Sequence, residues 1–333
     1  MNNTSNSLVS GIDPASFSAV TGPSQDLFRF VNGPWVDMYR LPDDRSRYGS
    51  FDKLAEDAEN QIRDILEEDD CPAVKSRALY HSFLDVDAID AAGLAAIEDQ
   101  LASIDEAEDK AALTRALGAM NPTGGPDLIG IAVYGDPGAP ETNVVHIEQD
   151  GLDLPDEAYY REDHYAPIRE AYVEMVAKQL KNAHLAADDE DAHAQAKRFL
   201  DVETRIAANH WDNVSTRDSV KTYNPTDYAD LCAMLADVDL DAWIDAWQNA
   251  YDATTAAAVQ PLDFRGCFSH TIVHEPSFLT GLNAFWKEAS LDDLKLWARV
   301  HVVIGSTLEL PHEFDETNFD FYGKTLSLSL IHI

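Results

Sequence analysis

The sequence has few cysteines and no long apolar run, and each shortage excludes a class of protein. Its three cysteines, Cys71, Cys232 and Cys267, are far apart, and no CxxC pair occurs. Neither a disulfide framework nor a cysteine zinc site is therefore predicted. No apolar run approaches the ~20 residues of a membrane-spanning helix, and the polar N-terminus does not resemble a signal peptide. We expect a cytoplasmic protein, because cysteine use of this kind suits a reducing compartment.

Basic residues are also scarce. The chain has 24 Lys and Arg against 60 Asp and Glu, which gives a formal net charge of −36 over 333 residues. This charge repels phosphate backbones and anionic lipid surfaces, so we expect neither a nucleic-acid nor a membrane partner. The hydrophobic content of 45% is typical of a folded globular protein.

Complete catalytic and metal-binding motifs are missing as well. A zinc peptidase of the HExxH type needs two histidines one helical turn apart and a glutamate beside the first. After His274-Glu275 the second histidine is replaced by Phe278, and after His312-Glu313 it is replaced by Glu316. We interpret both pairs as surface or turn residues. The sequence therefore predicts no catalytic residue and no metal ligand in this chain.

Apolar residues at helical spacing fill most of the sequence, which predicts a mainly α protein with a large multi-helix domain. Ser290 and Asp293 form a capping-box-like pair before one helix. Leu128–Tyr134 and Asn143–Glu148, separated by Gly135–Gly138, predict a small β-hairpin near 128–148. The helical stripes lie at Leu54–Leu66, Val74–Phe83, Leu94–Ile104, Leu113–Met120, Ile168–Leu180, Ala196–Ala207, Tyr228–Leu235, Trp243–Trp247 and Leu294–Ile304.

One stretch, Asp26–Phe51, is dense in aromatic residues, which bury large areas and anchor packing. Within it, Asn32-Gly33-Pro34 is expected to form a turn. Residues 1–22 before it are expected to form a flexible segment. Arg47 stands beside aromatic residues and a glycine, a setting that can aim a guanidinium at a carboxylate. A packing corner with a surface arginine is the simpler interpretation.

This stretch resembles the start of the neprilysin family of zinc metallopeptidases, in its bacterial oligoendopeptidase-like branch. Later segments resemble the family too, in the same order: Gly151–Pro155 followed by Tyr159-Tyr160, then Glu203–Ala207 and Phe321–Ser327. The residues that match the opening pattern of the family are Asp26, Phe28, Phe30, Asn32, Gly33, Trp35, Pro42, Arg47, Tyr48, Gly49 and Phe51.

The resemblance implies that residues 23–327 form the incomplete N-terminal helical domain of a zinc metalloendopeptidase that hydrolyses peptides of limited size. We interpret residues 328–333 as an aberrant or artificial tail. Zinc is then the cofactor of the full-length parent, its ligands are absent here, and the chain alone is expected to be inactive. The peptide substrate would be bound together with the missing catalytic domain. In a shortened domain, the helix face that begins with Leu294 and Trp297 is expected to lack partners.

Arg47 is the one substrate-binding residue that the resemblance implies, through contact with the C-terminal carboxylate of a peptide. A pairing of Arg47 with Asp43, Asp44 or Asp52 remains the structural alternative. A second family arginine, eight positions later, is replaced by Ala55, which puts a dipeptide-releasing specificity in doubt. The alternative function is a non-enzymatic acidic helical binding module. The DNA beyond the last family segment distinguishes the two, since only a peptidase gene encodes HExxH there.

Overall fold

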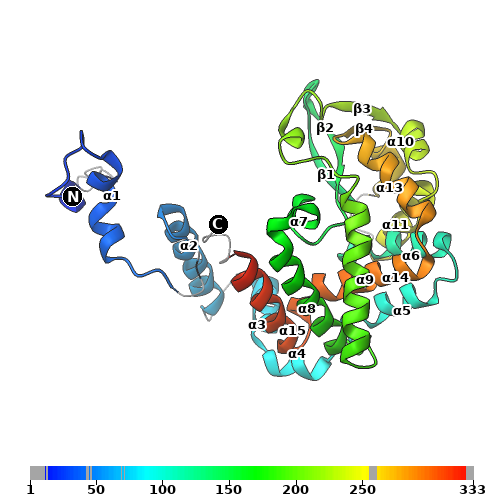
Figure 1. Ribbon diagram of the computed structural model, residues 1–333, viewed down its shortest axis with the longest axis horizontal. Coiled ribbons are helices and arrows are strands. Elements are labelled where there is room, and N and C mark those ends of the chain that lie inside the picture. The colour runs from blue at the N-terminus through cyan, green and yellow to red at the C-terminus, as the bar shows by residue number, and fades with distance from the viewer. Residues whose placement is uncertain are drawn as a thin grey trace. The chain divides into compact units, whose positions relative to one another are not determined.

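A computed structural model describes residues 12, 14–42, 45, 47–68, 70, 72–254 and 261–327. The chain is mainly helical with one small sheet, as the sequence predicted (Figure 1). It divides into two compact units, Met1–Ile65 and Leu66–Ile333. Each unit is described by itself below. The tail predicted at 328–333 lies outside the described residues.

Unit 1 contains a 3₁₀ turn, Pro14–Ser16, and the helices α1, Leu27–Met38, and α2, Ser50–Glu67, whose last residues cross into unit 2. Asp26, the first residue of the aromatic stretch, caps α1, because its Oδ1 accepts the N–H of Arg29 at 2.9 Å. Such a cap satisfies a backbone donor that would otherwise lack a partner. The helix predicted from Ser50 is confirmed.

The predicted turn at Asn32-Gly33-Pro34 is wrong, because these residues lie inside α1. Proline has no N–H, so in a regular helix the carbonyl of Phe30, four residues earlier, loses its donor. Here the N–H of Ser18 donates to the Phe30 oxygen at 2.7 Å. The ring of Phe17 also packs against that of Phe30, with centroids 5.0 Å apart. A partner from the preceding segment thus satisfies the carbonyl that the proline leaves free.

Unit 2 consists of the remaining helices and the sheet. In most cases the predicted stripes fall on its helices. One boundary differs: Leu94 and Ile97 precede α5, because Gly93, at φ +58°, ends α4 and a turn follows. The helices are α3 Val74–Leu84, α4 Val86–Ala92, α5 Glu98–Glu106, α6 Lys110–Met120, α7 Ala158–Arg161, α8 Ala166–Asn182, α9 Asp189–Ala207, α10 Tyr228–Met234, α11 Leu240–Thr254, α12 Phe264–Cys267, α13 Pro276–Glu288, α14 Leu291–Gly305, α15 His312–Asn318 and a π-helix Phe319–Leu326.

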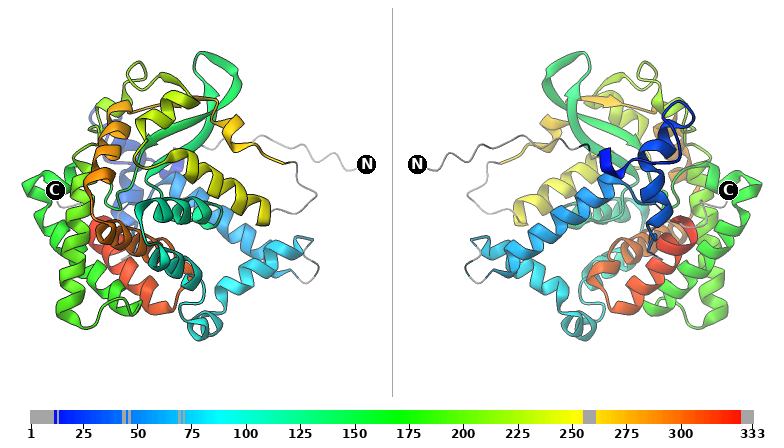
Figure 2. Two further views of the ribbon diagram at one scale, coloured as in Figure 1. Left: turned by 90° about the vertical axis from the view of Figure 1, so that its right-hand side faces the viewer. Right: turned by 90° about the vertical axis from the view of Figure 1, so that its left-hand side faces the viewer.

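The core of unit 2 forms where α8 packs on α9 and both meet α14 (Figures 1 and 2). Its largest fully buried side chains include Trp286, Trp297, Tyr172 and Phe199. Burial of each such side chain contributes about 1.5–3 kcal/mol. A second contact joins α6 to α11, and it is so close that a Cβ on Gly118 would lie 2.2 Å from the carbonyl oxygen of Trp243.

The helix α14 tests two expectations. Its N-cap is Ser290, whose Oγ accepts the N–H of Asp293 at 3.1 Å, so the predicted cap is confirmed. The expectation that its apolar face lacks partners is wrong: Leu294, Trp297 and the rest of that stripe are buried. The face packs against α9 and α5 within unit 2, so this packing does not depend on any further part of the chain.

The sheet has the strand order β1-β2-β4-β3, in which β1 and β2 form the predicted hairpin. The strands are β1 Ile129–Asp136, β2 Ala139–Gln149, β3 Asn224–Asp227 and β4 His270–Val273. β2 pairs with β4 in parallel, with His146 opposite Ile272. The hairpin tip lies at one end of unit 2 and α4 at the other (Figure 2). The hairpin was predicted, whereas β3 and β4 were not.

The two missed strands have four residues each, too few for an alternating pattern to stand out. The helix α9 ends at Ala207, before these residues. The residues Asn224–Asp227 form the edge strand of the sheet. An edge strand is where proline is tolerated, because its missing N–H breaks no ladder.

Apolar side chains remain exposed in unit 1. Phe51 is 87% exposed, and Phe28, Leu54 and Ile62 are also exposed.

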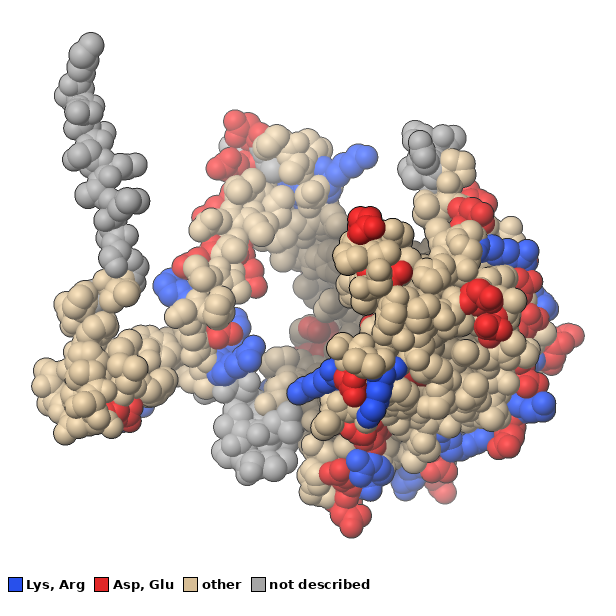
Figure 3. Space-filling view, turned by 90° about the horizontal axis from the view of Figure 1, so that it is seen from above, with Lys and Arg blue, Asp and Glu red and all other residues tan. Residues whose placement is uncertain are grey.

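On the face seen in Figure 3, Asp and Glu side chains are scattered among Lys and Arg rather than gathered in one patch. No helix within the described part of the chain is long and apolar enough to cross a membrane.

Candidate functional site

Arg47, the predicted substrate-binding residue, lies in unit 1 just before α2, and its side chain is exposed. It makes no hydrogen bond or ion pair with any described residue. The neighbouring Arg45 is the one that pairs, with Glu56 at 3.5 Å. Of the three acids proposed as alternatives, Asp52 makes no ion pair with Arg47, whereas Asp43 and Asp44 lie outside the described residues.

The residue after Arg47 is held firmly. The ring of Tyr48 stacks on Tyr39 at 4.6 Å between centroids, and Tyr39 stacks in turn on Trp35 at 4.8 Å. The Tyr48 hydroxyl donates to Glu56 at 2.6 Å, and this bond raises the pKa of the tyrosine. Three rings and a carboxylate therefore fix the backbone next to Arg47, while its guanidinium remains available.

A hollow of about 360 Å³ lies beside this stack. α1 contributes Phe28 and Trp35 to its wall, and Tyr48, Gly49 and Lys53 form the opposite side. The rings of Phe28, Trp35 and Tyr48 therefore form part of its lining. The sequence predicted the aromatic anchors and Arg47 but missed the roles of Arg45 and Glu56, for which no sequence signal existed.

In unit 2, the segments that carry the later resemblances converge on one buried carboxylate. Glu203 of α9 is fully buried. Its Oε1 accepts the N–H of Asp153 at 2.9 Å, and its Oε2 accepts the hydroxyls of Tyr160 and Tyr172 at 3.1 and 2.8 Å. The hydroxyl of Tyr322, from the π-helix, donates to the carboxylate of Asp153. Segments about 170 residues apart in the sequence thus meet here.

The electrostatics of this cluster are those of a structural network. Nε2 of His301 lies 3.2 Å from Oε1 of Glu203. Burial raises the pKa of Glu203. Burial alone would lower the pKa of His301, but the nearby Glu203 carboxylate raises it on balance. Both oxygens of the glutamate have a hydrogen-bond donor, as a buried charge requires, so the carboxylate supports the fold.

The structure corrects the interpretation of His274-Glu275 as surface or turn residues. The pair does follow a strand, β4, but Glu275 is only 3% exposed. Its Oε2 accepts the N–H of Gln149 at 3.0 Å. Nε2 of His274 lies 2.9 Å from Nδ1 of His146 on β2. Pairing of β4 with β2, which the sequence did not predict, carries these side chains inward.

The other motif-like residues have structural roles. Asn283 of α13 accepts the N–H of Asp237 at 2.6 Å through its Oδ1 and so holds a turn. Phe285 is buried, with the guanidinium of Arg205 4.8 Å from its ring centre. Among the described residues, no three His, Cys, Asp or Glu side chains are placed to hold a metal ion. The residues present therefore do not fit a zinc site.

Comparison with known proteins places this fold. The model of Peptidase family M13 matches residues 23–329. Human neprilysin is 24% identical over 332 residues, a match that covers 92% of this chain and 44% of neprilysin. The mouse membrane metallo-endopeptidase-like 1 is 26% identical over 212 residues, covering 57% of this chain and 28% of that protein.

Solved structures agree with these relatives. The Mycobacterium tuberculosis zinc metalloprotease Zmp1, in complex with an inhibitor, matches with a TM-score of 0.83 and 30% identity, over 97% of this chain and 50% of Zmp1. PepO from Lactobacillus rhamnosis shares the fold, with a TM-score of 0.72 at 16% identity over 94% of this chain and 50% of PepO. The chain spans about half the length of the relatives it matches. By the match over nearly its whole length, the chain belongs to peptidase family M13.

Proposed function

We propose that this chain is the N-terminal, substrate-enclosing part of a zinc metalloendopeptidase that hydrolyses peptides of limited size, and that Arg47 binds the C-terminal carboxylate of the peptide. The proposed role of Arg47 rests on a contrast between two neighbouring arginines. Arg45 is paired with Glu56, whereas Arg47 is exposed and has no partner among the described residues.

The physical case for Arg47 rests on its side-chain chemistry and on its support. A guanidinium stays charged at any working pH and can donate two parallel hydrogen bonds to a carboxylate. Charge-assisted bonds of this kind contribute about 1.5–3 kcal/mol, which corresponds to roughly tenfold or more in binding. The stacked Tyr48 next to it fixes the main chain from which the guanidinium extends, and a fixed donor loses less entropy on binding.

The zinc ion and the groups that activate water belong, in this proposal, to the part of the relatives that this chain does not cover. The described residues offer no metal site, so no catalytic step is assigned to them. The chain alone should then show no peptidase activity and no stoichiometric zinc after dialysis against a chelator. Tight binding of one zinc ion per chain would mean that a metal site exists within it.

The location that we propose is the cytoplasm. Cys232 and Cys267 are both free thiols, and free thiols are normal in a reducing compartment.

The decisive experiment uses the full-length parent and two peptides that differ only in a free or an amidated C-terminus. In the Arg47→Met variant, much of the aliphatic stem remains while the charge is lost. We expect kcat/KM to fall about tenfold or more on the free acid and little on the amide.

Arg45→Met is the matched control. It removes a neighbouring guanidinium that already pairs with Glu56, so any loss should be the same on both peptides. Equal losses on acid and amide in the Arg47→Met variant would show that Arg47 is structural and would overturn its assignment.

A further inference from the structure

A second hollow, far larger than a water site, lies within unit 2 and has no role in the proposal above. It encloses about 480 Å³, within the range of small-molecule sites. Its walls come from the end of β2, the segment 150–156, the loop 210–216 that follows α9, and the junction of β4 with α13. Strand pairing between β2 and β4 brings these segments together.

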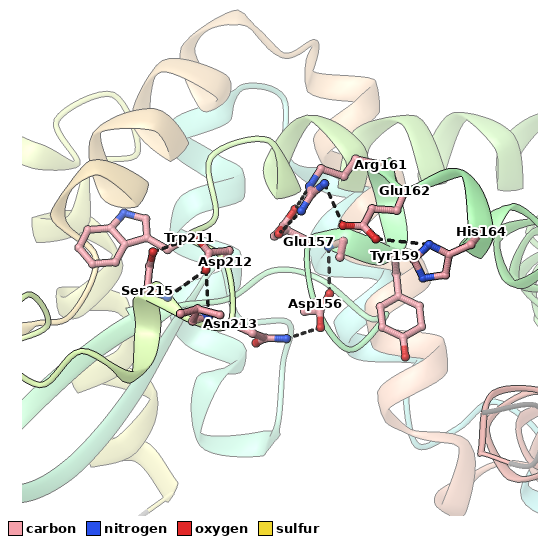
Figure 4. Close-up of polar contacts among 12 residues, drawn as sticks. Asp156, Glu157, Tyr159, Arg161, Glu162, His164, Trp211, Asp212, Asn213 and Ser215 are labelled. Atoms are coloured by element: carbon pink, nitrogen blue, oxygen red, sulfur yellow. Dashed lines mark hydrogen bonds and ion pairs between the residues drawn. The ribbon is translucent and has the colours of Figure 1, made fainter. Parts of the chain in front are cut away.

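The rim of this cavity is held by its own hydrogen bonds, many of which Figure 4 shows. The amide of Asn213 donates to the carboxylate of Asp156, which joins the two loops. Asp212 accepts the N–H groups of Val214 and Ser215, both at 2.9 Å. The cavity is therefore formed before any ligand arrives, which limits the entropy lost on binding.

The side chain of Gln149 fixes the loop from the other side. Its Nε2 donates to the carbonyl of Trp211 at 3.0 Å, and its Oε1 accepts the N–H of the same residue at 2.7 Å. The indole of Trp211 donates in turn to the hydroxyl of Ser277 at 2.6 Å. β2, the loop and α13 are thus tied together around the cavity.

The lining carries negative charge without a counter-ion. Four acids, Glu148, Asp150, Asp156 and Glu275, line it, and no lysine or arginine is found among the described lining residues. Two histidines line it as well. Burial lowers the pKa of His210 to about 4 and also lowers that of His274. Both are therefore neutral at pH 7 and cannot balance the carboxylates.

Glu275 is the least accessible of these acids. Although it lines the cavity, it is only 3% exposed. Its Oε2 accepts the N–H of Gln149 at 3.0 Å, whereas its Oε1 makes no hydrogen bond to a described residue and is not among the buried unpaired atoms, so it is open to the cavity. Burial raises the pKa of Glu275 to about 7, with Glu148 adding to the effect. A carboxylate so little exposed, in a cavity without a basic residue among its described lining, favours a cation as its partner.

We propose that this cavity binds the positively charged group of a peptide, either an arginine or lysine side chain or an N-terminal ammonium. A metal ion is a poorer fit, because no three potential ligands among the described residues are placed to hold one, and the volume accommodates a whole side chain. This inference rests on the proposed function only in taking a peptide as the source of the cation.

The acid–base groups around Glu275 give the binding a defined pH dependence. Glu148, Asp150, His210 and His274 face the same cavity. The two histidines are already neutral above pH 6.5. Between pH 6.5 and 8, an entering cation therefore favours ionisation of Glu275, and binding should release protons and become tighter as the pH rises.

The test is calorimetric titration of the 333-residue chain with Nα-acetyl-arginine amide, and with Nα-acetyl-citrulline amide as the uncharged analogue of nearly the same shape. We expect the arginine compound to bind at least tenfold more tightly. At pH 7, titration in two buffers of different ionisation enthalpy should reveal proton release. Nα-acetyl-lysine amide and alanine amide then distinguish a side-chain cation from an N-terminal ammonium.

Three variants complete the test. Glu275→Gln keeps an acceptor for the Gln149 N–H and removes the charge, so it should weaken binding of the cation about tenfold at pH 8 and abolish proton release. Glu148→Gln, at a more exposed lining position, should weaken binding less and keeps the proposal testable if Glu275→Gln fails to fold. Glu141→Gln, exposed on the same strand, should change nothing.

Two results would overturn the proposal: equal binding of the arginine and citrulline compounds, or unchanged binding in both lining variants. Neither result bears on the role of Arg47, since this assay needs no catalytic centre. Equally, a structural Arg47 would leave the cavity proposal in place.

Discussion

The aromatic stack of unit 1 and the Glu203 cluster of unit 2 are both built from segments that carry the family resemblance, yet they are arranged in opposite ways. The stack leaves the Arg47 guanidinium and the ring of Phe51 exposed. The cluster encloses a carboxylate and gives each of its oxygens a donor. The same kind of motif therefore leaves a charged group exposed in one unit and encloses one in the other.

This contrast explains why matching a motif does not by itself identify a functional residue. Glu203 and Tyr322 match family segments as clearly as Arg47 does, but every polar atom they present is used within the fold. The two cases differ in whether the polar atoms already have hydrogen-bond or ion-pair partners within the protein, which only the three-dimensional structure shows. A polar group that has no partner inside the protein is free to find one outside it.

The largest effect is expected when the cluster loses its central acid. Glu203→Ala leaves His301 and the hydroxyl of Tyr160 without their buried acid, and leaves the hydroxyl of Tyr172 with Asp153 alone, so the free energy of unfolding should fall by about 3–5 kcal/mol. Urea denaturation followed by circular dichroism measures this fall.

The matched control for this prediction is Glu174→Ala on α8. Glu174 pairs with His193 at an exposed position, so its removal should cost less than about 1 kcal/mol. Similar losses in the two variants would mean that the cluster is no more important than a surface pair, and the contrast between the units would fail.

Smaller effects are expected when a glycine in each unit is replaced by alanine, which tests how closely the surrounding atoms pack against it. Gly118→Ala places a Cβ against the carbonyl of Trp243, and such overpacking costs about 1–3 kcal/mol. In Gly33→Ala the nearest atom to the new Cβ is 3.8 Å away, so α1 should gain about 0.5–1 kcal/mol from the replacement of a helical glycine. Urea denaturation measures the first change, and hydrogen exchange of the α1 amides the second. A Gly118→Ala variant as stable as the wild type would contradict the close approach of α6 and α11.

The smallest effect concerns pH and the cavity. Burial raises the pKa of Glu275 in the folded state to about 7, from an ordinary value of 4.5. Its contribution to stability is therefore fully present below about pH 4.5 and is lost as the pH rises through 7. The melting temperature should thus decrease as the pH rises from about 4.5 to 7 and level off above that, and it should decrease by less in Glu275→Gln. Identical pH profiles for the wild type and the variant would show that the carboxyl is not perturbed.

Much of the fold could be predicted from the sequence, because long helices and a hairpin leave periodic patterns. The hairpin near 128–148 and the cap at Ser290 follow from local rules alone. The strands β3 and β4 could not be predicted, since four residues carry too little pattern and their pairing is non-local. Missing β4 also hid the cavity, because β4 is what carries Glu275 inward.

The candidate site was predictable only in part. Arg47 followed from a family pattern, but no sequence rule indicates that Arg45 rather than Arg47 binds Glu56. That choice depends on how the segment before α2 turns. The turn at Asn32-Gly33-Pro34 was mispredicted for a related reason. An Asn-Gly-Pro sequence is typical of a turn, but here the N–H of Ser18 replaces the donor that the proline lacks.

That hydrogen bond has a consequence for anyone who wishes to produce a shorter form of the protein. The boundary predicted at residue 22 would discard Ser18, and with it an amide that donates to the Phe30 carbonyl. A protein that begins at residue 23 would keep every residue of α1 and yet lose the group that lets a proline stand in its middle. Expression designs should therefore retain the residues from Pro14 onward.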